Sequence, residues 1–133
     1  AGGGRDAWKR PEFGCIAAAF CEKIILTDED PYDEDPERIL EAIESGFRAT
    51  IPAKLRRGRR QKILDRRAAI KTAIRLAKKG DTVIIKGAES WLMGKNGTRI
   101  PWDDRAIARE ALVALRPNAR KNIARSATES LKK

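Results

Sequence analysis

The chain has 133 residues, with 29 Lys and Arg against 19 Asp and Glu and no histidine, so its formal net charge is +10. Without an imidazole, the sequence excludes a Ser/His/Asp triad, a Cys/His dyad and an ordinary zinc site. A content of 41% hydrophobic and 36% charged residues is typical of a globular protein, and the length suits one domain with a single core.

The two cysteines, Cys15 and Cys21, are too few for a disulfide framework or a metal cage. We interpret them as reduced packing residues of a cytoplasmic protein in preference to a redox pair. No apolar run reaches the roughly 18 residues that cross a bilayer, and the N-terminus lacks a secretory signal, so we expect no membrane partner. Because the chain begins at Ala1 without methionine, we also expect it to be a piece of a longer protein.

Residues 11–21 follow a helical period, with a proline in the first turn. Their large apolar side chains and one alanine share a stripe that we expect to face the core: Phe13, Ile16, Ala17 and Phe20. The following residues, 23–27, include three consecutive aliphatic side chains. Such a run predicts a short, buried parallel strand.

Two further helices carry recognisable start and stop signals. Asp35 is placed to cap the first of them, Pro36 suits its first position, and Gly46 predicts its end. Asp65 is the predicted N-cap of the second helix, which we expect to continue toward Gly80.

The last part of the chain predicts a strand, a hairpin and a helix. Residues 82–85 are apolar and β-branched and predict a second buried strand. Residues 91–102 place apolar segments on both sides of a glycine-containing turn, which indicates a hairpin or an irregular excursion. A final helix begins near Asp103 and is ended by Pro117. This alternation predicts an α/β layer fold with parallel strands, and two strands are too few for such a sheet, so we expect its first strands to precede Ala1.

Charge is segregated along the chain. Residues 28–37 hold seven acids and no base, whereas residues 54–67 hold eight bases and one acid, and the tail is basic again. Such blocks are most often solvated faces, but a basic segment beside tryptophans also occurs in nucleic-acid-binding modules. Because the tryptophans are not interleaved with the basic run and no nucleic-acid-binding motif is present, we expect only non-specific nucleic-acid binding. A non-catalytic interaction module is a second alternative.

Three segments precede a helix or follow a predicted strand, where ligands of open parallel sheets gather. Residues 2–6 combine three glycines with Arg5 and can present backbone N–H groups to an anion. Residues 28–32 place carboxylates where an ammonium group or a divalent ion can bind, and residues 86–89 add a glycine and Glu89. Each has a plain alternative: a flexible glycine-rich start, a hydrophilic turn and a surface loop.

Five motifs, taken together and in this order, resemble the C-terminal domain of the Mur ligases. They are Gly2-Gly3-Gly4-Arg5-Asp6 with Lys9-Arg10-Pro11, Glu29-Asp30-Pro31-Tyr32, Asp65-Arg66-Arg67, Lys86-Gly87-Ala88-Glu89 and Asp103-Asp104-Arg105. The resemblance runs from about Gly2 to Leu115 and is greatest to the members that add the third amino acid of the peptidoglycan stem peptide.

The resemblance implies a Rossmann-like three-layer domain with a mainly parallel sheet that lacks its first strands here. It divides the chain into a partial amino-acid-binding domain over residues 1–116 and a basic tail over residues 117–133. It also implies an ATP-dependent amide ligase of peptidoglycan synthesis, in which a substrate carboxylate becomes an acyl phosphate that the amine of the amino acid attacks.

In that family, ATP and Mg²⁺ are bound mainly by other parts of the enzyme, an upstream UDP-sugar-binding domain and a central ATPase domain. The part that this chain resembles binds the amino acid and closes the active site. The resemblance therefore implies that the isolated chain is inactive, holds no catalytic residue or metal ligand, and binds no cofactor on its own.

Matching positions in the motifs imply two sets of site residues. The substrate-binding set is Arg5, Glu29, Asp30, Pro31, Tyr32, Gly87 and Glu89. The set expected to contact anions or phosphate is Lys9, Arg10 and Lys86.

Two positions depart from the family pattern. Tyr32 stands where the diaminopimelate-adding members have an arginine that pairs with the distal carboxylate, and Ile85 stands where a glycine precedes the lysine. Because Glu29, Asp30 and Glu89 also bring negative charge, we expect lysine, or another amino acid without a distal carboxylate, to be preferred over diaminopimelate.

Overall fold

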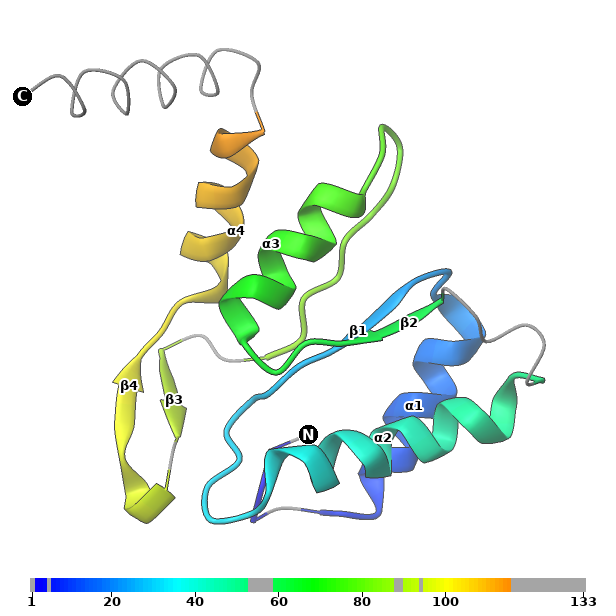
Figure 1. Cartoon of the computed structure of the whole chain (residues 1–133), viewed down its shortest axis with the longest axis vertical. Helices are drawn as coiled ribbons and strands as arrows, with labels where there is room; N and C mark the ends of the chain where they lie inside the picture. The colour runs from blue at the N-terminus through cyan, green and yellow to red at the C-terminus, as the bar shows by residue number, and fades with distance from the viewer. Residues whose placement is uncertain (1, 5, 53–58, 88–89, 94, 116–133) are drawn as a thin grey trace, which may run out of the picture.

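The computed structural model describes residues 2–4, 6–52, 59–87, 90–93 and 95–115 (Figure 1). In chain order its elements are α1 (Lys9–Phe20), β1 (Ile24–Leu26), α2 (Pro36–Thr50), β2 (Arg60–Lys62), α3 (Arg66–Leu76), β3 (Trp91–Met93), the short 3₁₀ helix η2 (Lys95–Gly97), β4 (Arg99–Pro101) and α4 (Asp104–Ala114). Within these ranges no helix combines the length and the apolar character needed to cross a membrane. The described part of the chain is thus a small α/β unit.

The arrangement has a short parallel ladder with helices on both sides. Strand β1 pairs in parallel with β2, in a register that sets Ile25 opposite Gln61. Helices α1 and α2 lie on one side of this ladder and α3 and α4 on the other (Figure 1). Strands β3 and β4 form a separate antiparallel hairpin, which lies beyond the start of α3 (Figure 1).

Among the buried apolar side chains are two clusters, one in each helix pair. The cluster between α3 and α4 consists of Ile70, Ile74, Ile107 and Ala111. The cluster between α1 and α2 consists of Ala18, Phe47 and Ile51, with Ile24 of β1 packed against it. One apolar cluster therefore lies on each side of the ladder (Figure 1).

The predicted starts of α2, α3 and α4 are confirmed by their caps. The Asp35 side chain accepts a hydrogen bond from Glu37 N, at 2.9 Å, and Pro36 is the first residue of α2. Asp65 accepts from Ala68 N at 2.8 Å, and Asp103 accepts from two backbone N–H groups at the start of α4. Pro117, the predicted end of that helix, and the predicted basic tail over 117–133 lie outside the described residues.

The strand predictions are only partly right. Strand β1 and the β3–β4 hairpin are confirmed. Residues 82–85 form no strand in the described chain, because no described segment pairs with them, and Ile84 is 79% exposed. Strand β2 was missed because its three residues are polar and lie inside the basic run, so they lack an apolar strand pattern. The described sheets are one parallel and one antiparallel pair, so a mainly parallel sheet is not what these residues form by themselves.

The predicted inward stripe of α1 is wrong for two of its four residues. Ile16 is 54% exposed and Phe20 is 85% exposed, whereas the buried positions are Arg10, Gly14 and Ala18. Small residues face α2 because the two helix backbones approach closely. A Cβ built on Gly14 would lie 1.9 Å from the carbonyl oxygen of Ile43, where no atom fits.

Gly46 does not end its helix as predicted, and the same helix contact explains why a glycine stands there. Helix α2 continues to Thr50, and a Cβ on Gly46 would lie 1.8 Å from the carbonyl oxygen of Pro11. The free thiol of Cys15 donates to the carbonyl oxygen of Gly46 at 3.5 Å, in the same contact. The glycine serves helix packing and not helix termination.

We predict that Gly46→Ala destabilises the protein, although Gly to Ala inside an exposed helix normally stabilises by about 1 kcal/mol. The added methyl group must push α1 away from α2, and overpacking of this kind costs about 1–3 kcal/mol. Thermal unfolding followed by circular dichroism measures the effect. Ser45→Ala, on the exposed side of the same turn, is the control and is expected to change stability by less than about 0.5 kcal/mol. A more stable Gly46→Ala variant would contradict the close helix contact.

Candidate functional site

The loop that follows β1, residues 28–32, is held in an unusual backbone conformation. Asp30 and Tyr32 have φ values of 47° and 53°, in the left-handed region that non-glycine residues adopt rarely. The loop is fixed from the hairpin side, because Met93 N donates to Asp30 Oδ1 at 2.6 Å and Tyr32 N donates to Met93 O at 3.4 Å. One carboxylate oxygen of Asp30 is thus used to fasten the loop to β3.

The glycine-rich segment fastens the other side of this loop. Gly3 N donates to the carbonyl oxygen of Asp30 at 2.7 Å. A Cβ on Gly3 would lie 1.9 Å from the carbonyl oxygen of Pro31, and one on Gly2 would lie 2.7 Å from that of Asp30. These glycines are packed against the loop after β1, so the alternative of a flexible glycine-rich start does not describe Gly2 and Gly3.

The buried Arg10 and Glu34 hold the glycine-rich segment in place through hydrogen bonds to its backbone. The Arg10 guanidinium donates to Glu34 Oε1 at 2.9 Å and to the carbonyl oxygen of Gly2 at 3.2 Å, and Gly4 N donates to Glu34 Oε1 at 2.6 Å. The hydrogen bond from Arg10, followed by that from Gly4 N, lowers the pKa of Glu34 below its ordinary value. Arg10 is therefore engaged within the chain, while Lys9 forms an ion pair with Asp6 at the surface.

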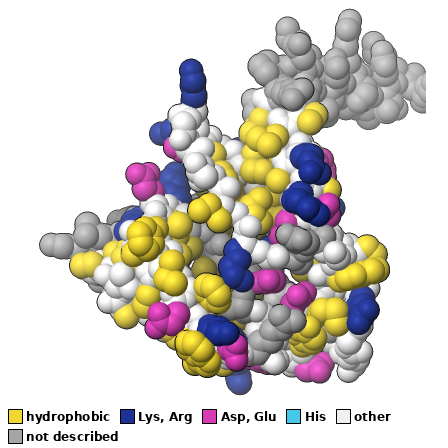
Figure 2. Space-filling model, turned by 180° about the vertical axis from the view of Figure 1, so that it is seen from behind, with side chains coloured by type: hydrophobic (Ala, Val, Ile, Leu, Met, Phe, Trp, Pro, Cys, Tyr) yellow, Lys and Arg dark blue, Asp and Glu magenta, His cyan; other side chains and the backbone are white. Residues whose placement is uncertain are grey.

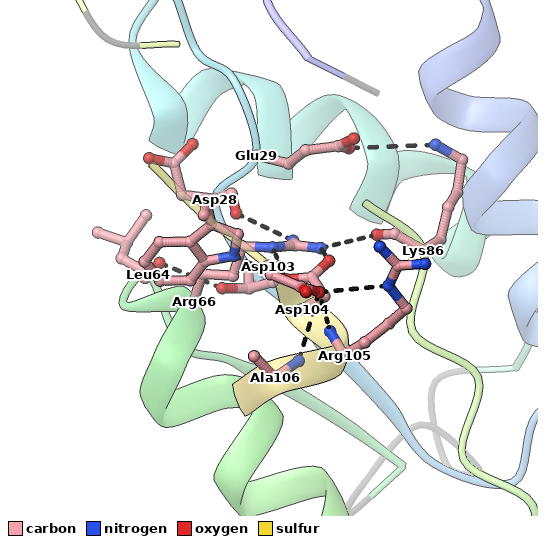
Figure 3. A network of polar contacts seen from close by, with 11 residues as sticks. Asp28, Glu29, Leu64, Arg66, Lys86, Asp103, Asp104, Arg105 and Ala106 are labelled. Atoms are coloured by element: carbon pink, nitrogen blue, oxygen red, sulfur yellow. Dashed lines mark hydrogen bonds and ion pairs between the residues drawn. The ribbon is translucent and has the colours of Figure 1, made fainter. Parts of the chain in front are cut away.

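Two of the predicted segments meet at Glu29 and Lys86. The Lys86 ammonium lies 4.0 Å from Glu29 Oε2 (Figure 3) and 4.7 Å from the centroid of the Phe13 ring. Gly87 follows in the same loop. Arg5 and Glu89, the other two residues expected at this place, lie outside the described residues.

An ion-pair network beneath these loops was missed as a site feature by sequence reasoning. Arg66 and Asp104 form a bidentate pair, with Nε to Oδ1 at 2.9 Å and Nη2 to Oδ2 at 2.6 Å (Figure 3). Trp102 Nε1 also donates to Asp104 Oδ1, at 2.8 Å. The signal in the sequence was the pair of motifs around Asp65-Arg66 and Asp103-Asp104, which supported the resemblance, but no role was assigned to Arg66 or Asp104.

An open cavity of about 400 Å³ borders the loop after β1. Its lining is Asp28, Asp30, Pro31, Leu64, Asp65, Arg66, Arg67, Leu92, Met93, Ile100 and Trp102. The volume lies within the range of about 300–1,000 Å³ that is typical of small-molecule sites. Burial is the main reason that the pKa of Asp28 is raised above its ordinary value.

The basic run is largely paired within the chain. Each described Lys or Arg between positions 59 and 67 contacts an acceptor of its own chain: Arg59 the carbonyl oxygens of Ala18 and Cys21, Arg60 Glu44, Lys62 Glu37, Arg66 Asp104 and Arg67 Glu110. These cations are less available to a phosphate backbone than the sequence indicated. Residues 54, 56 and 57 lie outside the described residues, and weak non-specific binding stays a prediction.

Helices on both sides of a short parallel ladder form a small α/β unit (Figure 1), and its candidate site lies at the carboxyl end of β1, where ligands of open parallel sheets gather. A family profile described as "Mur ligase, glutamate ligase domain" matches residues 1–89. The chain therefore belongs to the Mur ligase family, as its five motifs indicated.

Individual relatives agree with this assignment. The chain is 40% identical over 116 residues to the UDP-N-acetylmuramoyl-L-alanyl-D-glutamate–2,6-diaminopimelate ligase of Cytophaga hutchinsonii, over 86% of this chain and 23% of that protein. It is 43% identical over 114 residues to the UDP-N-acetylmuramyl-tripeptide synthetase of Treponema denticola, over 84% of this chain and 20% of that protein. The chain thus spans about a fifth of the length of these relatives.

A solved structure shows the same fold. It is described as a UDP-N-acetylmuramoyl-L-alanyl-D-glutamate–2,6-diaminopimelate ligase and matches with a TM-score of 0.71 at 38% sequence identity. The match covers 86% of this chain and 22% of that structure. The small α/β unit described here is therefore shared with a member of this family.

We predict that Glu34→Gln lowers the stability of the folded protein in a pH-dependent way. Because the folded-state pKa of Glu34 is lowered, its contribution to stability is fully present above the ordinary glutamate pKa and is lost as the pH falls through the lowered value. The difference in Tm between Glu34→Gln and wild type is thus expected at pH 7 and disappears in acid. Glu12→Gln, at an exposed position of α1, controls for the change in net charge. A difference that is constant from pH 7 to acid would refute the Arg10–Glu34 account.

Proposed function

We propose that this chain is the C-terminal part of an ATP-dependent amide ligase of peptidoglycan synthesis. The ligase adds the third amino acid to UDP-N-acetylmuramoyl-dipeptide through an acyl phosphate, and this part binds the amino acid and closes the active site. The observation that carries the proposal is the convergence of residues 2–4, 28–32 and 86–87, three predicted site segments, around the carboxyl end of β1. The relatives named above support the choice of reaction.

The chemistry of such a ligase explains what the chain contributes. An acyl phosphate is lost to water unless the attacking amine is already positioned and water is excluded. A loop that is fastened on one side by the glycine-rich segment and on the other by β3 is suited to hold an amino acid in one orientation. In this proposal Arg5, Glu29, Asp30, Pro31, Tyr32, Gly87 and Glu89 bind the substrate, and Lys9, Arg10 and Lys86 are the candidate anion contacts.

Exposed apolar side chains support further packing partners. Trp8 is 69% exposed, and Phe20 and Ile84 are also open on the described surface, where hydrophobic side chains form several separate patches (Figure 2). Exposed apolar patches of sufficient size mark surfaces that another part of a protein covers. We propose that additional strands of a Rossmann-like three-layer domain, and upstream UDP-sugar-binding and ATPase domains, cover these groups in the full-length protein.

We propose that ATP and Mg²⁺ are bound mainly outside the residues that the structure describes. Mg²⁺ is held by carboxylates and phosphate oxygens, and the described residues contain no group of three or more His, Cys, Asp or Glu side chains that can hold a metal ion. The sequence also lacks a Gly-Lys-Ser or Gly-Lys-Thr phosphate-binding loop. We therefore assign the nucleotide and its metal to the upstream ATPase domain.

We predict that the isolated chain neither hydrolyses ATP nor ligates an amino acid. The reason is that phosphoryl transfer needs a phosphate-binding loop lysine and a magnesium site. The sequence has no such loop, and the described residues hold no cluster of three or more metal-ligating side chains. A phosphate-release assay on the purified chain measures the first activity, and product analysis with UDP-N-acetylmuramoyl-dipeptide measures the second. ATP turnover that persists through repeated purification would refute this division of labour. A full-length protein that folds but ligates nothing would favour the non-catalytic alternative.

We predict that the full-length protein has a higher kcat/KM for lysine than for meso-diaminopimelate. Tyr32 offers no cation to the distal carboxylate, whereas nearby Glu29 and Asp30 favour an ammonium group. Tyr32→Arg is expected to shift the ratio toward diaminopimelate by about tenfold or more, since a hydrogen bond to a charged group contributes about 1.5–3 kcal/mol.

The control for this exchange is Tyr32→Phe, which keeps the ring and removes the hydroxyl. All three residues face the same backbone strain at φ 53°, so a difference among them reports the side chain. Tyr32→Phe is expected to leave the ratio unchanged. A wild-type preference for diaminopimelate that Tyr32→Arg does not alter would show that position 32 does not select the amino acid.

A further inference from the structure

The side chain of Arg66 is almost fully buried, although the residue lines the cavity described above. Its side chain is 3% exposed, and its partner Asp104 has a side chain that is 9% exposed. The guanidinium lies at the first residue of α3 and Asp104 at the first residue of α4, so the pair joins the starts of two helices. The guanidinium therefore offers little surface to a substrate, and the next question is which groups it holds in place.

Besides Asp104, the guanidinium binds two backbone carbonyl groups from different loops. Nη1 donates to the carbonyl oxygen of Asp28 at 3.2 Å, and Nη2 donates to that of Lys86 at 3.1 Å (Figure 3). Asp28 immediately precedes Glu29, and Lys86 immediately precedes Gly87. One rigid, planar group therefore bridges the two loops that carry most of the candidate substrate-binding residues.

Gly87 packs directly against the Arg66 guanidinium. A Cβ at position 87 would lie 1.5 Å from Arg66 Nη2 and 2.4 Å from its Cζ. Any side chain at position 87 therefore has to displace the guanidinium. The glycine is needed because Arg66 occupies the space that a side chain would take.

Asp104 completes the arrangement by fixing the plane of the guanidinium. Its two oxygens accept from Nε and Nη2, which leaves Nη1, and the second hydrogen of Nη2, directed at the two carbonyl groups. Trp102 Nε1, from the residue that follows β4, donates to the same carboxylate. The β3–β4 hairpin, which also fastens Asp30, is in this way linked to the same network.

We infer that Arg66 is a positioning residue for the amino-acid site: it sets the separation between the loop at residues 28–32 and the loop at residues 86–87 without touching the substrate. This inference rests on the proposed function, since the separation of the two loops affects activity only if both loops bind the amino acid. Loss of the bridge frees the two loops relative to each other. A displacement of about 1 Å between groups that hold a reactant can cost about a hundredfold in rate.

The first experiment compares Arg66→Met and Arg66→Lys with wild type in the full-length protein that carries this chain. Both variants are expected to raise KM for the amino acid by about tenfold or more, while KM for ATP stays within about twofold. Arg66→Lys keeps the charge but offers a point-like ammonium group that cannot serve Asp104 and two carbonyl groups in one plane. Relative to Arg66→Met, Arg66→Lys is therefore expected to recover much of the wild-type Tm, whereas KM for the amino acid stays raised.

The control is Arg60→Met, which removes one partner of the buried Glu44 in another ion pair, at α2 and β2. It is expected to lower Tm without changing KM for the amino acid. Folded Arg66→Met protein with a wild-type KM for the amino acid would overturn the inference. An equal rise of that KM in Arg60→Met would also overturn it, because the effect would then belong to general destabilisation.

The second experiment tests the bridge without an activity measurement. In wild type, Gly87→Ala is expected to lower the Tm of the protein, because the methyl group collides with the guanidinium. In the Arg66→Met background the same change is expected to cost much less, so the two substitutions are strongly non-additive. Additive effects would overturn the assignment of Gly87 to Arg66. Wild-type full-length protein that ligates no amino acid would instead refute the proposed function, and the Arg66–Gly87 coupling would then decide the structural bridge by itself.

Discussion

The buried pair of Arg66 and Asp104 is the interaction on which the rest of the structure depends. A charge with 3% side-chain exposure has to be neutralised and fully hydrogen-bonded, and removing one partner of such a pair costs about 3–5 kcal/mol. The guanidinium meets this requirement only where the starts of α3 and α4 and the carbonyl groups of Asp28 and Lys86 come together. Four segments that are far apart in the sequence are therefore placed by one side chain.

The segregated charge has the same explanation on a larger scale. The acidic and basic blocks along the chain meet in the pair of Glu37 with Lys62, and Arg60 of the basic block pairs with Glu44 of α2. Glu44 has a side chain that is only 3% exposed, so part of the basic run serves the interior and not a polyanionic partner. The excess positive charge of the whole chain, +10, remains a source of weak attraction to any polyanion.

Local signals predicted most of the elements but not their contacts. The caps at Asp35, Asp65 and Asp103 were readable because each depends on a side chain and on backbone groups within three residues. Strand β2 could not be predicted from its own residues, since it forms by pairing with β1, which lies more than thirty residues away in the sequence. The inward face of α1 was misassigned for a related reason: Gly14 is buried because of where α2 lies, which the helical period alone does not contain.

The sequence by itself determined the family, through five motifs in order, and the positions of the candidate site residues within it. Only the tertiary structure decided how those residues are held: Asp30 by β3, Gly3 by the loop after β1, and Gly87 by the space that Arg66 fills. The physical reason is that a motif records which groups a site requires, whereas the close approaches that fix them are made between segments distant in the chain. Glycine is the clearest case, because the sequence shows that a side chain is absent and the structure shows which atoms occupy its place.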